Sequence, residues 1–172
     1  MSLCQARLLK ELKFMEIERK FLIDRFPDAL PLISECEMHQ LYISVMPTVR
    51  ARSKKTSDGE TYRLTVKGSG ELVREEIEID ISKEQFDGLC RVAEKEPIKK
   101  LLRCYALPDG LVLECSLVDE GTKTEFMYAE VEFESVEAAE KFDVPDFLGQ
   151  EVTYDNSWKM NNYWKRTRLE NK

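Results

Sequence analysis

The sequence has little of what most metal centres and catalytic triads require. It contains a single histidine, His39, and its five cysteines form no CxxC pair and no zinc-ligand spacing. A histidine-based metal site is therefore almost excluded, and a Ser/His/Asp triad would have to use His39, which lies in a strand-like stretch with no GxSxG motif elsewhere. An odd number of cysteines without a disulfide framework is typical of a reducing compartment, so we expect a cytoplasmic protein.

Long apolar runs and a basic charge balance are also missing. No apolar run reaches the ~18 residues of a membrane span, and no signal-peptide pattern stands at the start, so we expect no membrane partner. The net charge of −7 argues against a nucleic-acid partner. The "MSL" start resembles a vector-derived one, and we expect an N-terminal extension over 1–14 and a single domain over 15–172.

What the sequence does have is alternation of polar and apolar residues with a period of two, which predicts strands. We expect them at 15–23, 37–45, 48–55, 61–68, 71–81, 98–107, 111–118 and 126–134, with a further candidate at 149–154. Helices are predicted at 82–95, where Ser82 and Gln85 form a capping box, at 135–142 and in the tail at 156–170. This pattern predicts an α+β fold, mainly antiparallel β, with a closed eight-stranded barrel and a few flanking helices.

The polar faces of these strands carry charges that are segregated by strand. Arg50, Arg52 and Lys54 share one face of a strand, whereas Glu130 and Glu132 share one face of another. The ordinary alternative is a sheet with a solvated face, but such faces usually pair opposite charges across strands. A barrel with a charged interior explains the segregation better, because the basic groups would bind a polyanion and the carboxylates a hard divalent cation, Mg²⁺ or Mn²⁺.

The stretch EIERK at 16–20 shows the same arrangement at its most compact. Glu16, Glu18 and Lys20 alternate with Ile17 and Arg19, so a strand would place two carboxylates and an ammonium on one face. We interpret Glu16 and Glu18 as inward-facing metal ligands and Lys20 as a ligand of the anion.

Several motifs together resemble the CYTH domain, or triphosphate tunnel metalloenzyme, family, which includes class IV adenylate cyclases, thiamine triphosphatases and inorganic triphosphatases. The resemblance runs from about Met15 to Asn161 and rests on EIERK, VRAR, RLTVKGSG, VREEIE, AEVEF and FLGQEVTYD, in the family's order. It implies a tunnel that holds a triphosphate, with Glu16, Glu18 and Lys20 as catalytic residues. The implied substrate ligands are Lys20, Arg50, Arg52, Lys67, Arg74 and Arg103; the implied metal ligands are Glu16, Glu18, Glu130 and Glu132; the accessory residues are Glu76, Glu78, Glu114 and Glu151.

The sequence departs from the family pattern at two positions. Where members usually have KxR, Leu101 stands at the lysine position before Arg103, and the neighbouring Lys100 would need a register shift or bulge to replace that lysine. Where members often have ExD, Ser116 follows Glu114. Both departures bear on catalytic rate and substrate choice.

The resemblance implies three possible functions. The first is a metal-dependent hydrolase of inorganic triphosphate or an organic triphosphate, in which water attacks the terminal phosphorus. The alternative is a class IV type adenylate cyclase that converts ATP to cyclic AMP and pyrophosphate. The second alternative is a noncatalytic module that binds polyphosphate or nucleotide. In each case the partner is a triphosphate-containing small molecule, and we expect a monomer or a homodimer.

Overall fold

The computed structural model describes residues 15–170, so the expected extension over 1–14 lies outside the described residues. The strands are β1 (Met15–Leu22), β2 (Leu32–Val45), β3 (Thr48–Thr56), β4 (Gly59–Lys67), β5 (Val73–Asp80), β6 (Ile98–Ala106), β7 (Val112–Val118) and β8 (Phe126–Glu132). The helical elements are α2 (Lys83–Ala93), α3 (Val136–Lys141), α4 (Met160–Trp164), short turns η1 (Pro108–Gly110) and η2 (Asn156–Trp158), and a π-helical turn η3 (Lys165–Leu169). Among residues 15–170, no helix has the length and apolarity needed to cross a membrane.

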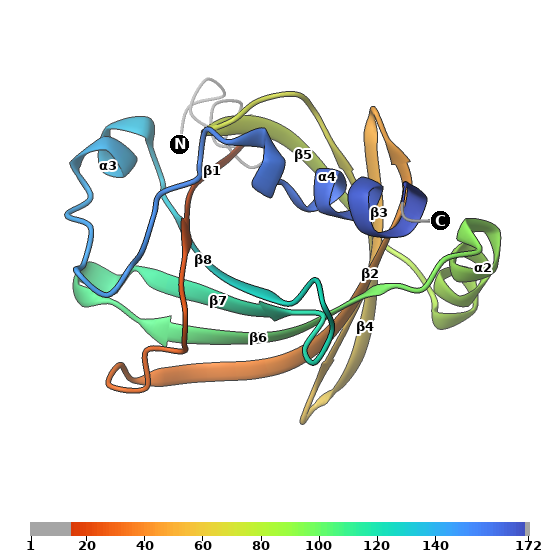
Figure 1. Cartoon of the computed structure of the whole chain (residues 1–172), viewed down its shortest axis with the longest axis horizontal. Helices are drawn as coiled ribbons and strands as arrows, with labels where there is room; N and C mark the ends of the chain where they lie inside the picture. Colours follow the sequence, from red (N-terminus) through yellow and green to blue (C-terminus); the bar gives the residue numbers. More distant parts are fainter. Residues whose placement is uncertain (1–14, 171–172) are drawn as a thin grey trace, which may run out of the picture.

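The strands form one antiparallel sheet in the order β1-β5-β4-β3-β2-β6-β7-β8, which curls around a central space (Figure 1). The predicted eight-stranded, mainly antiparallel sheet with flanking helices is confirmed. The junction between β1 and β5 is short: three residue pairs, from Met15↔Glu75 to Ile17↔Val73, join the two strands, and the rest of β1 pairs with β8. The predicted closed barrel is therefore not confirmed: the architecture is a strongly curled half-barrel in which β1 and β5 meet only at one narrow seam.

Three predicted elements differ in extent from those in the structure. The β2 strand begins at Leu32, before the predicted start at 37. The candidate strand at 149–154 is reduced to a single bridge between Phe21 and Glu151. The predicted tail helix is broken into η2, α4 and η3. The capping box of α2 is present as predicted, with Ser82 and Gln85 bonded reciprocally.

The apolar faces of the strands point away from the curled interior and are buried under the helices. In β1 the buried Ile17 and Phe21 alternate with the inward-facing charged residues, and Phe21 packs near the ring of Phe142 after α3, with centroids 6.5 Å apart. At the other end of the molecule, Phe86 of α2 packs on Tyr62 of β4, with centroids 5.4 Å apart. Much of the core therefore lies outside the sheet, although the buried Met38 and Leu102 face the cavity beside its charged groups.

We expect Phe21→Ala to lower the free energy of unfolding by about 3–5 kcal/mol, because it empties a site where the side chain is 1% exposed. Ile79→Ala is the matched control, since Ile79 lies on the same outer surface of the sheet but is 53% exposed, and its cost should stay below ~1 kcal/mol. Urea unfolding followed by circular dichroism measures both. Equal losses for the two variants would contradict an outer core at Phe21.

Candidate active site

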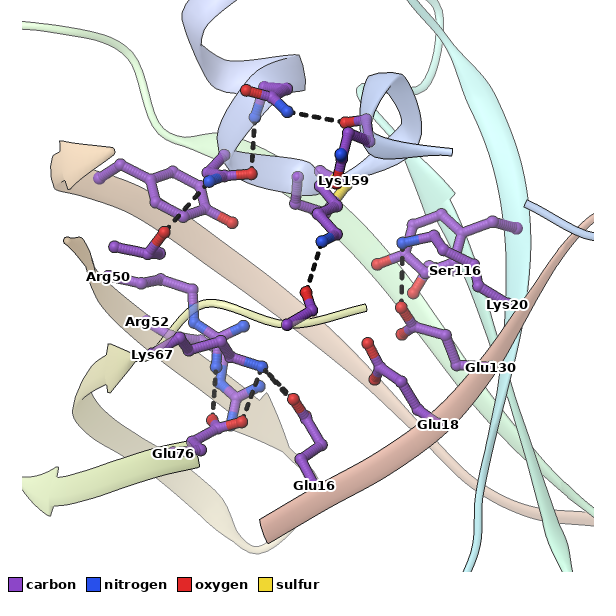
Figure 2. Close-up of a pocket in the computed structure, with 18 of the residues that line it drawn as sticks. Glu16, Glu18, Lys20, Arg50, Arg52, Lys67, Glu76, Ser116, Glu130 and Lys159 are labelled. Carbon is purple, nitrogen blue, oxygen red and sulfur yellow. Dashed lines mark hydrogen bonds and ion pairs between the residues drawn. The ribbon is translucent and has the colours of Figure 1, made fainter. Parts of the chain in front are cut away.

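A cavity of about 1700 Å³ occupies the interior of the curled sheet, and charged side chains line it (Figure 2). The strict alternation within the strands places the motif residues on this inner face. Those that line the cavity are Glu16, Glu18, Lys20, Arg50, Arg52, Lys67, Glu76, Glu78, Glu114, Glu130 and Glu132. The structure thus brings eleven of the fourteen residues singled out in the sequence into one space; their individual roles stay predictions.

Of the other three, two lie apart from this cluster and one is not described. The side chain of Arg74 lies outside the described part of the structure. Arg103 points to the outer surface, where its Nε donates to Glu35 Oε2 at 2.6 Å and its guanidinium carbon lies 4.3 Å from the ring centroid of Phe26. Glu151 also lies apart from the cavity and accepts two hydrogen bonds from Arg19, at 2.5 and 2.8 Å.

Arg103 lies on the outer face because successive residues of β6 face opposite sides of the sheet. This strand pairs with β2 so that Lys100 and Leu102 face the cavity, and Arg103 pairs with Glu35 on the opposite face. The sequence comparison with KxR had assigned the inner face to positions 101 and 103. The observed register makes Lys100 the inward-facing cation of this strand, without the bulge that the sequence argument required.

Several basic side chains of the cavity form ion pairs with carboxylates from other strands. Lys67 of β4 contacts Glu16 of β1 at 2.8 Å and Glu76 of β5 at 2.7 Å. Arg50 of β3 lies 3.5 Å from the same Glu76. On the far side of β1, Lys20 pairs with Glu130 of β8 at 2.9 Å, as Figure 2 shows. The segregated charges seen in the sequence are therefore compensated largely between adjacent strands, because Lys67 is the register partner of Glu76 and Lys20 that of Glu130.

A second region of the cavity carries an excess of carboxylates. Register pairs Glu18 with Glu132 and Glu114 with Glu130, so four carboxylates gather from three adjacent strands. The side chain of Glu132 opens onto the cavity. Its partial burial, followed by the nearby charges of Glu114, Glu16 and Glu130, raises its pKa to about 7. Burial, followed by the charge of Glu130, raises the pKa of Glu114 as well. A cation placed here would relieve that repulsion.

The donor set fits a hard divalent cation, because carboxylate oxygens are the ligands that Mg²⁺ and Mn²⁺ prefer. The carboxylates are nevertheless spread out: within residues 15–170, no three His, Cys, Asp or Glu side chains are gathered closely enough to hold a metal ion. Since Glu16 and Glu130 are engaged by Lys67 and Lys20, their rearrangement would accompany metal binding.

Known proteins resemble this chain in sequence and in fold. No protein-family model matches the sequence. A protein of Nitrosomonas europaea named inorganic triphosphatase is 38% identical over 148 residues, which make up 84% of this chain and 93% of that protein. The chain belongs to the triphosphate tunnel metalloenzyme family. A solved structure of an inorganic triphosphatase, 32% identical, matches 86% of this chain and 93% of its own with a TM-score of 0.61. A structure from Pyrococcus horikoshii OT3, at 18% identity, TM-score 0.54 and coverage of 72% and 81%, shares the fold.

This triphosphate tunnel metalloenzyme also has cations in its cavity that are not among the substrate ligands implied by the family resemblance. Lys54 continues the inward face of Arg50 and Arg52, so the period of two was sufficient to find it. Lys100 required the register of β6. Lys159 lies outside every strand, in the C-terminal segment, and nothing in its local sequence indicates that it reaches the cavity.

Lys100 is the most perturbed of these cations. Its Nζ donates to the hydroxyl of Tyr128, and its ammonium lies 4.9 Å from the centroid of that ring. Burial, reinforced by the nearby charges of Lys20, Arg50 and Arg52, lowers the pKa of Lys100 to about 7. A lysine in this state exchanges its proton close to neutral pH and is one of the functional groups that tunnel metalloenzyme chemistry could use.

We expect Lys100→Met to stabilise the protein at pH 7, with a gain that shrinks as the pH rises towards 10. An unfolded lysine has a pKa of about 10.4, so between about 7 and 10.4 the unfolded chain binds a proton that the folded chain does not, and this residue makes wild-type stability rise with pH. The variant lacks that rise. Urea unfolding of both proteins at several pH values measures the difference.

The matched control is Lys99→Met, since Lys99 is exposed and is the neighbour of Lys100 on β6. Because Lys99 is exposed, its substitution should change the free energy of unfolding by no more than ~0.5 kcal/mol. A pH-independent difference between Lys100→Met and the wild type would show that Lys100 has an ordinary pKa in the folded protein.

Proposed function

We propose that this protein is a divalent-metal-dependent hydrolase of triphosphate substrates. The observation that carries the proposal is the cavity itself, in which inward-facing cations meet a carboxylate excess within one enclosed space. The identity of 38% with an inorganic triphosphatase supports the same conclusion. The curled sheet would then serve as the wall of a tunnel around a polyphosphate.

The triphosphate would be held by Lys20, Arg50, Arg52 and Lys67, the cations that the ion pairs now occupy. Arginine favours this role because its fork binds oxyanions bidentately, and each charge-assisted hydrogen bond contributes about 1.5–3 kcal/mol. The phosphate oxygens would replace the carboxylates as partners of these groups. Phosphoryl transfer needs mainly such positioning and charge neutralisation, so a preassembled set of cations accounts for most of what the protein has to supply.

Glu16, Glu18, Glu130 and Glu132 would hold Mg²⁺ or Mn²⁺, with Glu114 close to Glu130 on the adjacent strand. A divalent ion bound there supplies neutralisation of the charge on the phosphate oxygens. The carboxylates of Glu16 and Glu130 become free for this role when Lys67 and Lys20 turn to the substrate. The same exchange therefore prepares both the anion site and the cation site.

Lys100 would accept the proton of the attacking water. A general base works best when its pKa lies near the operating pH, and the pKa of Lys100, about 7, meets that condition. Its hydrogen bond to Tyr128 fixes the position of the amine within the cavity. The inferred bond change is attack of the water oxygen on the terminal phosphorus, with pyrophosphate as the leaving group.

The cyclase alternative needs a place for a nucleobase, and the aromatic rings that line the cavity are those of Tyr42 and Tyr128. The ring of Tyr128 is the natural stacking surface, but the ammonium groups of Lys20 and Lys100 lie 3.7 and 4.9 Å from its centroid. Those charges suit phosphate rather than a base. We therefore favour hydrolysis over cyclisation.

Incubation of the purified protein with inorganic triphosphate and Mg²⁺ or Mn²⁺ should release equal amounts of orthophosphate and pyrophosphate. Colorimetric phosphate detection and ion chromatography measure the two products, and omission of the metal should abolish both. Cyclic AMP from ATP would support the cyclase alternative. Binding without any product would support the noncatalytic one.

Glu18→Gln should lower the rate of triphosphate hydrolysis by roughly 100-fold or more, because it removes charge from the proposed metal site. The fold should persist, since the carboxylate faces a polar cavity and its loss relieves repulsion with Glu132, its partner in register. Glu134→Gln removes an exposed charge after β8 and serves as the control. Unchanged turnover of the Glu18 variant at saturating Mg²⁺ would remove Glu18 from the metal site.

A further inference from the structure

The C-terminal segment over 156–165 borders the cavity on one side of the curled sheet. In Figure 1, α4 lies along one edge of the opening that the strands surround. Asn156, Lys159 and Asn161 from this segment line the cavity together with the motif residues. Figure 2 shows that the side chain of Lys159 points from the segment into this space. A cation therefore enters the cavity from outside the strands.

The segment is attached to the rest of the molecule on two sides. On one side, Asp119 after β7 accepts a hydrogen bond from Tyr163 at 2.6 Å and pairs with Arg168 at 2.7 Å, and Asp119 and Tyr163 are buried. On the other side, Lys159 Nζ donates to the backbone carbonyl of Gly70 at 2.6 Å, and Asn161 Nδ2 donates to Thr48 Oγ1 at 3.1 Å. The buried anchor does not depend on Lys159.

The bond between Lys159 and Gly70 is one that a substrate can replace. Gly70 belongs to the loop between β4 and β5, and residues 68–71 of that loop also line the cavity. A neutral carbonyl is a weaker partner for an ammonium group than an ionised phosphate oxygen, because its oxygen carries only a partial negative charge whereas the phosphate oxygen belongs to a full anion. A polyphosphate in the cavity would therefore compete for Lys159.

We propose that Lys159 is a substrate-binding residue that contacts the terminal phosphate at this side of the cavity and selects bare triphosphate over nucleoside triphosphates. This rests on the proposed function. A bare triphosphate has an ionised phosphate at each end, whereas a nucleotide has an uncharged ribose at one end. Lys159 can form an ion pair with the second terminal phosphate of a bare triphosphate, whereas the ribose of a nucleotide offers it no anion.

The test compares KM for inorganic triphosphate with the inhibition constant of ATP as a competitor, both with Mg²⁺, in the full chain. Lys159→Met should raise KM for triphosphate by about tenfold or more, while the inhibition constant of ATP changes by less than about threefold. Lys159→Arg keeps the charge and should restore most of the preference. If the methionine variant keeps its KM, or if triphosphate and ATP weaken equally, Lys159 does not select the substrate.

Asn161→Ala is the matched control, because it removes the other contact on the same side of the segment without removing charge. If it shifts the preference as strongly as Lys159→Met, then the placement of the segment, rather than the ammonium group, determines selectivity and the proposal is wrong. If the wild type hydrolyses no triphosphate, the proposed activity fails. Titration calorimetry with triphosphate on the same variants then decides the role of Lys159 on its own, with a tenfold loss of affinity in Lys159→Met as the expected result.

Discussion

The ion pairs inside the cavity are the interactions on which the rest of this structure depends. Rows of like charge on neighbouring strands would repel one another in an enclosed space, where solvent screening is weak. Lys67 shows how the repulsion is relieved, since its ammonium contacts Glu16 of β1 and Glu76 of β5 at once. These are the two strands that only three residue pairs join. This ammonium, which contacts a carboxylate from each strand, therefore reinforces the narrow seam of the sheet.

A charged interior forces the apolar core to the outside, and this explains where the helices lie. Outward-facing residues such as Phe21 and Ile17 are buried under α3 and the segment after it, and α2 covers Tyr62 and neighbouring apolar residues of β4. The outer surface is not covered everywhere, because Ile77 and Ile79 of β5 stay 43% and 53% exposed. The same strands thus contribute to the core with their outward-facing residues and to the cavity with their inward-facing ones, because polar and apolar residues alternate along each strand.

That alternation also decides what could be predicted from the sequence. The inner faces of β1, β3, β5 and β8 follow from a strict period of two, so Glu18, Arg52 and Glu130 were placed correctly in the cavity. Arg103 was assigned to the same face from a family motif, but the register of β6 gives that face to Lys100. The single bridge at Glu151 is too short for alternation to apply. The ion pairs between strands and the position of the C-terminal segment depend on tertiary structure, so a local sequence pattern cannot predict them.

In the proposed enzyme the ion pairs link anion binding to cation binding. As long as Lys67 contacts Glu16 and Lys20 contacts Glu130, neither the lysines nor the carboxylates are available to a ligand. A polyphosphate that takes the lysines exposes the carboxylates, and a divalent cation that takes the carboxylates exposes the lysines. The ligand that binds first breaks these ion pairs, so the second ligand binds without that cost. The two binding free energies are therefore coupled, and each ligand must raise the affinity for the other by the same factor. If the proposed function is right, the charge pattern that first distinguished EIERK is the physical origin of this coupling between triphosphate and metal ion.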